Sequence, residues 1–300
     1  MRALVTGGAG FIGSHLVDAL VAAGEEVIVV DHLQRGHTAN LAGALEAGVR
    51  IARADVTDVS AMTALFREVE PDVLFHLAAQ IDVRRSVADP STDAHVNVGG
   101  TASVLEAARH SGTRRAILAS TAGVYGDPAA LPVAEDAPMA PLSPYGASKA
   151  AAETYMALFS RLHGISTLSL RLANAYGPRQ DPHGESGVVA IFAAADGPVT
   201  VYGDGDQTRD YVYVADVVAA FLAAAGSDIE GALNISTGVE TTVLDLVHEL
   251  ELDARFAPSR PGDVRRSCLD PSLARERLGW SARFALADGL GRMRAAAFAV

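Results

Sequence analysis

The chain has 300 residues, of which 49% are hydrophobic and 20% charged, and its formal net charge is −12. This length can bury a full core, and the acidic balance argues against binding to nucleic acid or to an anionic membrane surface, although local arginines can still hold an anionic ligand. A single cysteine, Cys268, excludes an internal disulfide and a Cys-based metal cluster, and no metal site is expected. The N-terminus has no layout of a cleavable signal, and no apolar run approaches membrane-spanning length, so a cytoplasmic protein is expected.

A glycine-rich turn follows the first expected strand. Residues 4–6 form a short apolar run, and a helical pattern continues from the turn to Gly24. Glycines at this spacing fit a turn that brings backbone N–H groups and a helix N-terminus against a pyrophosphate. The cofactor contacts expected from this turn are Gly7, Gly10, Phe11, Ile12 and Gly13.

The second expected strand, residues 26–30, ends in Asp31. A dinucleotide-binding fold places an acid here, about 20 residues beyond the glycines, on the adenosine ribose hydroxyls. The carboxylate of Asp31 repels a 2′-phosphate, so the pattern favours NAD over NADP. Arg35 lies close by and leaves that preference open.

Strand and helix patterns then alternate, which predicts an α/β fold with a doubly wound parallel sheet that binds ligands at the carboxyl ends of its strands. Beyond residue 172 the rhythm breaks into a loop and shorter strands. We therefore expect an NAD-binding domain over residues 1–171 that carries the catalytic residues, and a smaller α/β substrate domain over residues 172–300, interleaved with the first. The expected elements are strands at 50–54, 73–77, 115–119, 165–170, 199–202 and 232–236, and helices at 59–69, 93–110 and 144–163.

Tyr145 and Lys149 are the most informative pair in the chain. Pro144 suits the first turn of a helix, and the Ala-rich stretch that follows favours one. A spacing of four residues places the phenol and the ammonium on one helix face. A lysine cation near a tyrosine favours the phenolate, so Tyr145 is expected to have a lowered pKa and to act as a base near neutral pH. Such a pair taken alone is usually an amphipathic surface pair.

With these residues in place, the chain resembles the extended short-chain dehydrogenase/reductase family, whose fold is of the Rossmann type. Within it, the chain is most similar to NAD-dependent nucleotide-sugar epimerases of the UDP-glucose 4-epimerase type. The resemblance runs from residue 2 to about residue 290. It rests on Thr6-Gly-Gly-Ala-Gly-Phe-Ile-Gly13, Asp55-Val56, His76-Leu-Ala-Ala79, Asn97, Ser120-Thr-Ala-Gly-Val-Tyr-Gly126, Tyr145-x-x-x-Lys149, Arg171-Leu-Ala-Asn174, Tyr202-Gly-Asp-Gly-Asp-Gln-Thr-Arg-Asp-Tyr211 and Arg260-Pro-Gly-Asp263.

The resemblance implies further cofactor contacts and a third catalytic residue. Thr121, after the strand at 115–119, is placed beside Tyr145, where its hydroxyl would hydrogen-bond the reacting sugar oxygen. Tyr145 and Lys149 then serve both catalysis and cofactor binding. The additional cofactor contacts implied are Asp55, Val56, Leu77, Ala78, Ala79 and Asn97.

The implied reaction is redox at C4 of the sugar with no net oxidation. Tyr145 as phenolate removes the 4-hydroxyl proton, tightly bound NAD accepts and returns the hydride, and the 4-keto sugar turns over in the site. Related sugar 4,6-dehydratases carry an acidic pair after the corresponding threonine. This chain has Ala122 and Gly123 there, whose side chains cannot transfer a proton, so dehydration and decarboxylation are disfavoured.

Substrate contacts to a nucleoside diphosphate are implied in the C-terminal half. Arg209 and Arg260 offer planar forks suited to phosphate oxygens. By the same resemblance, Asp263 is expected at the ribose and Asn174 at the diphosphate or the sugar. Val189 and Tyr202 are expected at the base, and Arg84 at the sugar. The full set of expected substrate residues is Arg84, Thr121, Asn174, Val189, Tyr202, Arg209, Arg260, Asp263 and Ser267.

Two features of the sequence bear on which sugar is bound. Leu172-Ala173 stands where family members often have Tyr-Phe, and the small Ser267 predicts space for an N-acetyl group. UDP-glucose/UDP-galactose is the favoured pair, with UDP-glucuronate and UDP-N-acetylhexosamine 4-epimerases, an NAD-dependent sugar ketoreductase and a non-enzymatic dinucleotide-binding regulator as alternatives. The family also implies a homodimer that pairs through the helices at 93–110 and 145–163.

Overall fold

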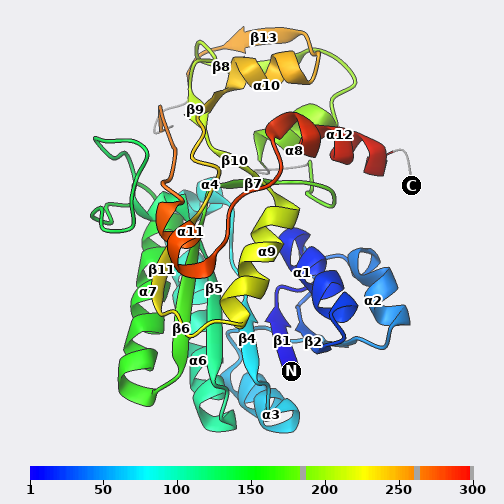
Figure 1. Ribbon diagram of the computed structural model, residues 1–300, viewed down its shortest axis with the longest axis vertical. Coiled ribbons are helices and arrows are strands. Elements are labelled where there is room, and N and C mark those ends of the chain that lie inside the picture. Colours follow the sequence, from blue (N-terminus) through cyan, green and yellow to red (C-terminus); the bar gives the residue numbers. More distant parts are fainter. Residues whose placement is uncertain (183–186, 260–263, 298–300) are drawn as a thin grey trace.

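The protein folds into a large sheet layered by helices and a smaller domain at one end of it (Figure 1). The structure is a computed structural model, and it describes residues 1–182, 187–259 and 264–297. None of the described helices is long and apolar enough to cross a membrane.

The large sheet has seven strands in the order β11-β6-β5-β4-β1-β2-β3, and every neighbouring pair is parallel. The reversal of strand order beside β1 creates the crevice in which doubly wound sheets bind ligands. The predicted fold is therefore confirmed. The strands are β1 (Arg2–Thr6), β2 (Glu26–Val30), β3 (Arg50–Ala52), β4 (Val73–His76), β5 (Arg115–Thr121), β6 (Ser166–Leu172) and β11 (Gly231–Ile235).

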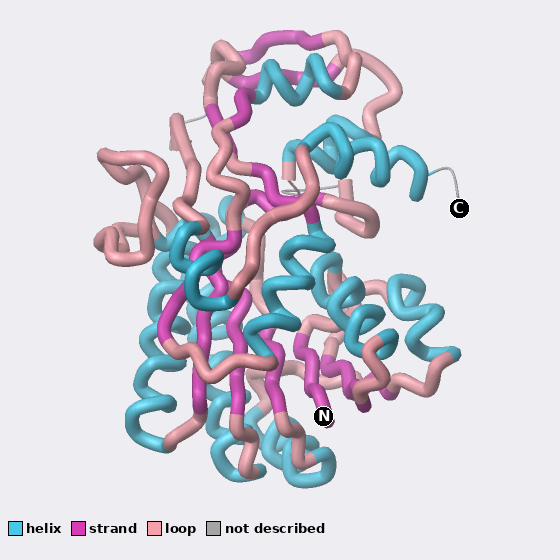
Figure 2. The backbone as a smooth tube through the Cα atoms, in the orientation of Figure 1, coloured by secondary structure: helices cyan, strands magenta, loops and turns pink. Residues whose placement is uncertain are grey.

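Helices cover both faces of this sheet because alternate strand residues point to opposite sides. Ala3 and Val5 of β1 enter one apolar cluster, whereas Leu4 enters the other. The Leu4 side is covered by α3 (Val59–Val69), α6 (Gly100–Ser111) and α7 (Pro144–His163). The other side is covered by α1 (Phe11–Ala22), α9 (Val214–Ala225) and α11 (Ser272–Leu278), as Figure 2 shows for the helices around the magenta strands.

The local sequence signals set the ends of α7. Ser143 caps the helix, since its hydroxyl accepts a hydrogen bond from the N–H of Gly146 at 3.1 Å. Pro144 occupies the first helical position, and Gly164 ends the helix in the left-handed conformation with φ of 70°. The predicted helices over residues 144–163 and 59–69 are confirmed.

The predicted helix over residues 93–110 is confirmed, with a π-helical turn inside it. The chain forms α5 (Pro90–Ala94), a π-helical turn (His95–Gly99) and then α6. The wide turn accompanies a buried Asn97, whose amide is hydrogen-bonded to the backbone of Gln80 after β4. This interaction joins residues far apart in the chain, which local periodicity does not report.

The smaller domain is built from short strands around its own apolar cluster, which includes Tyr176, Val201 and Leu246. Between its parts, the chain returns to the large sheet to form α9 and β11. The elements of this domain are β7 (Asn174–Tyr176), β8 (Val199–Tyr202), β9 (Thr208–Arg209), β10 (Tyr211–Tyr213), β12 (Thr241–Thr242), β13 (Ala254–Ala257), α8 (Val188–Ala193), α10 (Val243–Glu249) and α12 (Leu286–Ala297). Two short helices, α2 (Ala42–Glu46) and α4 (Val83–Ala88), complete the set that bears on the site.

Candidate active site

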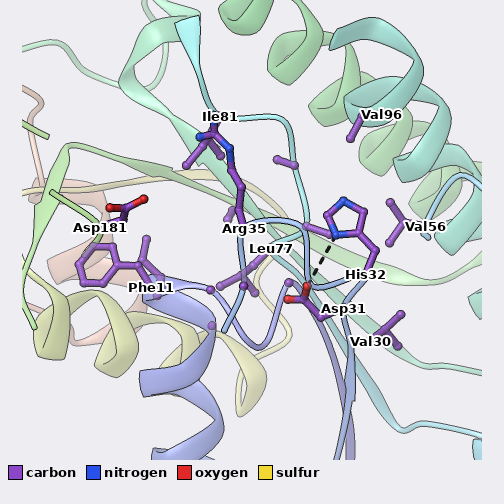
Figure 3. Close-up of a pocket in the computed structure, with 18 of the residues that line it drawn as sticks. Phe11, Val30, Asp31, His32, Arg35, Val56, Leu77, Ile81, Val96 and Asp181 are labelled. Carbon is purple, nitrogen blue, oxygen red and sulfur yellow. Dashed lines mark ion pairs between the residues drawn. The ribbon is translucent and has the colours of Figure 1, made fainter. Parts of the chain in front are cut away.

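A cavity of about 330 Å³ lies at the carboxyl ends of the central strands. Figure 3 shows its labelled residues, with Val56 and Val96 on one side and Phe11 and Asp181 on the other. The predicted cofactor residues on its wall are Gly7, Gly10, Phe11, Ile12, Gly13, Asp31, Asp55, Val56, Leu77, Ala78, Ala79, Tyr145 and Lys149.

The glycine turn leaves backbone groups facing this cavity. A Cβ atom at Gly13 would lie 2.2 Å from the carbonyl oxygen of Gly7, and one at Gly7 would lie 2.7 Å from the N of Ala78. Side chains are therefore excluded at these two positions. Gly10 precedes α1 and supplies no side-chain cap, so N–H groups of the first helical turn are open to an anion. The turn fits the pyrophosphate of a dinucleotide.

Asp31 is held in place at the end of β2. Its carboxylate accepts hydrogen bonds from the N–H groups of Ala9 at 3.0 Å and Leu33 at 2.8 Å. A carboxylate offers about four lone pairs, so two remain for ribose hydroxyls. Arg35 reaches across toward Ile81 in Figure 3 and pairs with Asp82 at 3.3 Å. The charge of Arg35 is thus partly neutralised by Asp82. The Asp31 carboxylate, which can still accept hydrogen bonds from ribose hydroxyls, fits NAD.

The base candidates come together where β5 meets α7. Lys149 is buried, and its Nζ donates a hydrogen bond to the carbonyl oxygen of Ala119 at 2.9 Å. Tyr145 lines the cavity, and Thr121, the last residue of β5, is hydrogen-bonded to its phenol. The three predicted catalytic residues therefore lie together at the mouth of the dinucleotide cavity.

The buried site shifts the pKa values of Tyr145 and Lys149. Burial raises the pKa of Tyr145 to about 12, more than the hydrogen bond with Thr121 lowers it, and the charge of Asp93 raises it further. Burial also lowers the pKa of Lys149 to about 8, against the opposing effects of Asp93 and Glu153. The lowering of the Tyr145 pKa expected in the reaction refers to Lys149 and the positive nicotinamide ring together, and it stays a prediction for the protein with NAD bound. A further positive charge at the phenol is needed to form the phenolate near neutral pH.

A buried ion pair connects the strands and the helix that carry the catalytic residues. Arg171 of β6 binds the carboxylate of Glu153 of α7 through Nε and Nη2, with Nη2 at 2.8 Å, and both side chains are 7% exposed. Glu153 also accepts a hydrogen bond from the hydroxyl of Ser120, the neighbour of Thr121. Arg171 donates to the phenol oxygen of Tyr125 at 2.7 Å. The strand of Thr121 and the helix of Tyr145 are thereby tied together.

Asn97 does not lie on the cavity wall. Its side-chain oxygen accepts a hydrogen bond from the N–H of Gln80, and its amide nitrogen donates to Ser148 on α7 at 2.9 Å. In this structure its polar atoms serve the packing of the loop after β4 against α7.

Of the residues predicted for the substrate that the structure describes, none is on the cavity wall, and Thr121 adjoins it through Tyr145. Val189 belongs to the apolar cluster of the smaller domain, and Arg209 of β9 donates to the carbonyl oxygen of Thr208 at 2.7 Å. Arg84 is on the exposed face of α4. Asn174, Tyr202 and Ser267 are half-buried in or beside the smaller domain, and Arg260 and Asp263 lie outside the described residues. Their role in substrate binding stays a prediction.

The cavity wall also holds residues that the sequence analysis did not assign. Arg179, Gln180 and Asp181 approach it from the loop after β7, and Asn40 from the segment before α2. Arg179 has a φ of 65° and pairs with Asp18 of α1 at 2.8 Å. The loop-like composition of residues 176–182 was the only signal, and it did not indicate that the loop returns to the cofactor cavity.

The fold and the site define an enzyme that binds a dinucleotide and places a tyrosine, a lysine and a threonine at the reacting end of its cavity. Comparisons with known proteins agree. The model of the NAD dependent epimerase/dehydratase family matches residues 3–236. A UDP-glucose 4-epimerase of Mycolicibacterium smegmatis is 48% identical over 97% of this chain and 97% of its own.

Solved structures agree in the same way. A UDP-glucose 4-epimerase from Thermotoga maritima, crystallised with UDP-glucose, has a TM-score of 0.96 and 41% identity, covering 100% of this chain and 99% of its own. A UDP-glucose 4-epimerase from Thermus thermophilus in complex with NAD has a TM-score of 0.92 and 42% identity, covering 99% of this chain and 98% of its own. The chain belongs to the NAD dependent epimerase/dehydratase family, and its cofactor is NAD.

The buried pair of Arg171 and Glu153 gives a stability prediction. Replacing one partner, in Arg171→Met, leaves a buried charge unmatched and is expected to cost about 3–5 kcal/mol of unfolding free energy. The double variant Arg171→Met/Glu153→Leu removes both charges and is expected to be more stable than the single variant. Urea denaturation at neutral pH measures both. A single variant within about 1 kcal/mol of the unchanged protein would contradict this account.

Proposed function

We propose that this protein is a UDP-sugar 4-epimerase that interconverts UDP-glucose and UDP-galactose with NAD bound throughout. The observation that carries the proposal is the placement of Thr121, Tyr145 and Lys149 together at the cavity built for the dinucleotide. The residues after Thr121 support redox at C4 alone, since Ala122 and Gly123 offer no side chain that could act as an acid in a dehydration.

Each protein group has a defined task in this reaction. Tyr145 takes the proton of the 4-hydroxyl group and returns it to the new alcohol. Thr121 holds the same oxygen through its hydroxyl, and Lys149 stabilises the phenolate through its positive charge. Bound NAD supplies the hydride acceptor and donor for C4. Because the hydride is returned, the protein has no net need for added cofactor.

The replacement Tyr145→Phe tests this function. It removes the proton acceptor, and a general base is worth about 10²–10⁴ in rate, so kcat should fall by that factor with bound NAD retained. The assay incubates purified protein with UDP-galactose and no added cofactor, and follows UDP-glucose by chromatography.

The matched control for that variant is Tyr155→Phe, on the same helix, whose side chain is 37% exposed and outside the cavity wall. This control should keep the activity of the unchanged protein. If the unchanged protein carries NAD and yet converts no UDP-galactose, the glucose/galactose assignment is wrong. A Tyr145→Phe variant of unchanged activity would remove the phenol from the mechanism.

Ser267 supports a second substrate for the same site. The family resemblance places Ser267 beside the C2 substituent of the sugar, where its small, half-buried side chain would leave room for the N-acetyl group of a UDP-N-acetylhexosamine. The same assay with UDP-N-acetylgalactosamine decides this, because turnover of UDP-galactose alone would restrict the enzyme to the simple hexoses.

The resemblance to the family also supports a homodimer that works in the cytoplasm. Tyr155 and Leu162, seven residues apart on α7, leave apolar surface on one helix face, and Leu162 is 65% exposed. Pairing of α6 and α7 with a second copy would cover that face. Light scattering is expected to give about twice the chain mass of 31.1 kDa, and a monomer at micromolar concentration would contradict the dimer.

A further inference from the structure

Asp93 is a buried carboxylate to which neither the sequence nor the proposed reaction assigns a task. It lies on α5 and is 1% exposed. Its Oδ1 accepts hydrogen bonds from Nε2 of Gln80 at 2.9 Å and Nδ2 of Asn97 at 3.2 Å. No group within the described part of the chain donates to its Oδ2. Burying such a group costs free energy, so its retention calls for an explanation.

The carboxylate is connected to the helix that carries the base. The two hydrogens on Nδ2 of Asn97 are shared among three acceptors: Oγ of Ser148 at 2.9 Å, the carbonyl oxygen of Gln80 at 3.0 Å and Oδ1 of Asp93 at 3.2 Å. The Ser148 hydroxyl donates in turn to the carbonyl oxygen of Tyr145 at 3.0 Å. Ser148 stands between Tyr145 and Lys149, and α5 packs directly against α7. A change at Asp93 therefore reaches the turn that holds both catalytic side chains.

The other groups that face Lys149 are either paired with a cation or uncharged. From its own helix, Glu153 is matched by the bidentate Arg171 of β6. From β4, His76 is neutral, because burial lowers its pKa to about 3. From β5, the contact is the backbone oxygen of Ala119.

The cations near this region lie at its surface. Arg84 and Arg85 of α4 and His95 of the π-helical turn are exposed. None of them forms an ion pair with Asp93 among the interactions that the structure describes. Among the described residues, Asp93 is thus a buried carboxylate that acts on the charge of Lys149 and has no ion pair of its own.

We propose that Asp93 is a positioning residue for the epimerase reaction, whose buried charge acts on Lys149 and Tyr145 and whose bond to Asn97 anchors the first turns of α7. The proposal rests on the proposed function in that Tyr145 and Lys149 carry the proton transfer. It assigns Asp93 to the control of their charge states and not to contact with the substrate.

The sign of the effect follows from the charges. The carboxylate of Asp93 raises the pKa of Tyr145 and that of Lys149. The reaction needs a phenolate and an ammonium together, so the pH profile of kcat has an acid limb and an alkaline limb that this pair of groups sets jointly. Removing the negative charge lowers both pKa values. The whole pH profile then moves to lower pH, and activity relative to the optimum rises on the acid side while it falls on the alkaline side.

The variant Asp93→Asn tests this directly, because the amide keeps the size and an acceptor oxygen. In the holoenzyme, kcat for UDP-galactose is measured across pH, and both limbs are expected at lower pH than in the unchanged enzyme. An ultraviolet difference titration of the phenolate, with the Tyr145→Phe protein subtracted, is expected to show the same direction for Tyr145 without any substrate.

The matched control is Asp216→Asn. Asp216 is also 1% exposed and accepts hydrogen bonds from the N–H groups of Arg283 and Phe284, away from the site. Its variant should keep both limbs at the original pH even where it lowers stability. A general loss of packing would lower kcat in either variant without moving the profile.

The proposal would be overturned if a folded Asp93→Asn protein showed both limbs of the kcat pH profile, and the phenol titration of Tyr145, at the same pH as the unchanged protein. If that variant does not fold, Asp93→Ser, whose hydroxyl accepts the Gln80 bond, repeats both measurements with the same two outcomes. If the unchanged enzyme shows no turnover of UDP-galactose, the proposed substrate fails, while the phenol titration still decides the role of Asp93.

Discussion

The site depends on the buried ion pair between Arg171 and Glu153. It joins β6 to α7, and through the Ser120 hydroxyl it also joins α7 to the end of β5. Thr121 and Tyr145 come from elements separated in sequence, and their contact requires these elements to keep a fixed relative position. A buried pair with all its partners in place supplies geometry more than stability, because desolvation offsets most of its attraction.

Burial shifts the pKa values of the two catalytic groups in opposite directions. In the protein without cofactor, it raises the pKa of Tyr145, so the phenol resists ionisation, and it lowers the pKa of Lys149, so the ammonium loses its proton more readily than in water. In the proposed reaction, the positive nicotinamide ring of bound NAD would be an additional charge that favours the phenolate. Binding of the oxidised cofactor and formation of the base would then be linked.

The sequence was sufficient where a function depends on local spacing. The Tyr145–Lys149 pair follows from helix geometry, and the glycine turn before α1 follows from its position between a strand and a helix. It was insufficient where a residue acts through partners distant in the chain. Asp93, Arg171 and Arg179 have roles set by tertiary contacts, and the π-helical turn at Asn97 depends on the loop after β4. No periodicity or motif spacing carries that information.

The central claim is that the hydrogen on C4 of the sugar leaves and returns as hydride within one site. UDP-galactose that carries deuterium at C4 tests it most directly. The labelled substrate is incubated in ordinary water with no added cofactor, and UDP-glucose is isolated and examined by mass spectrometry. The account predicts that the deuterium is retained at C4 of the product. Exchange of the label into water would contradict it, because C4 would then lose a proton and not a hydride.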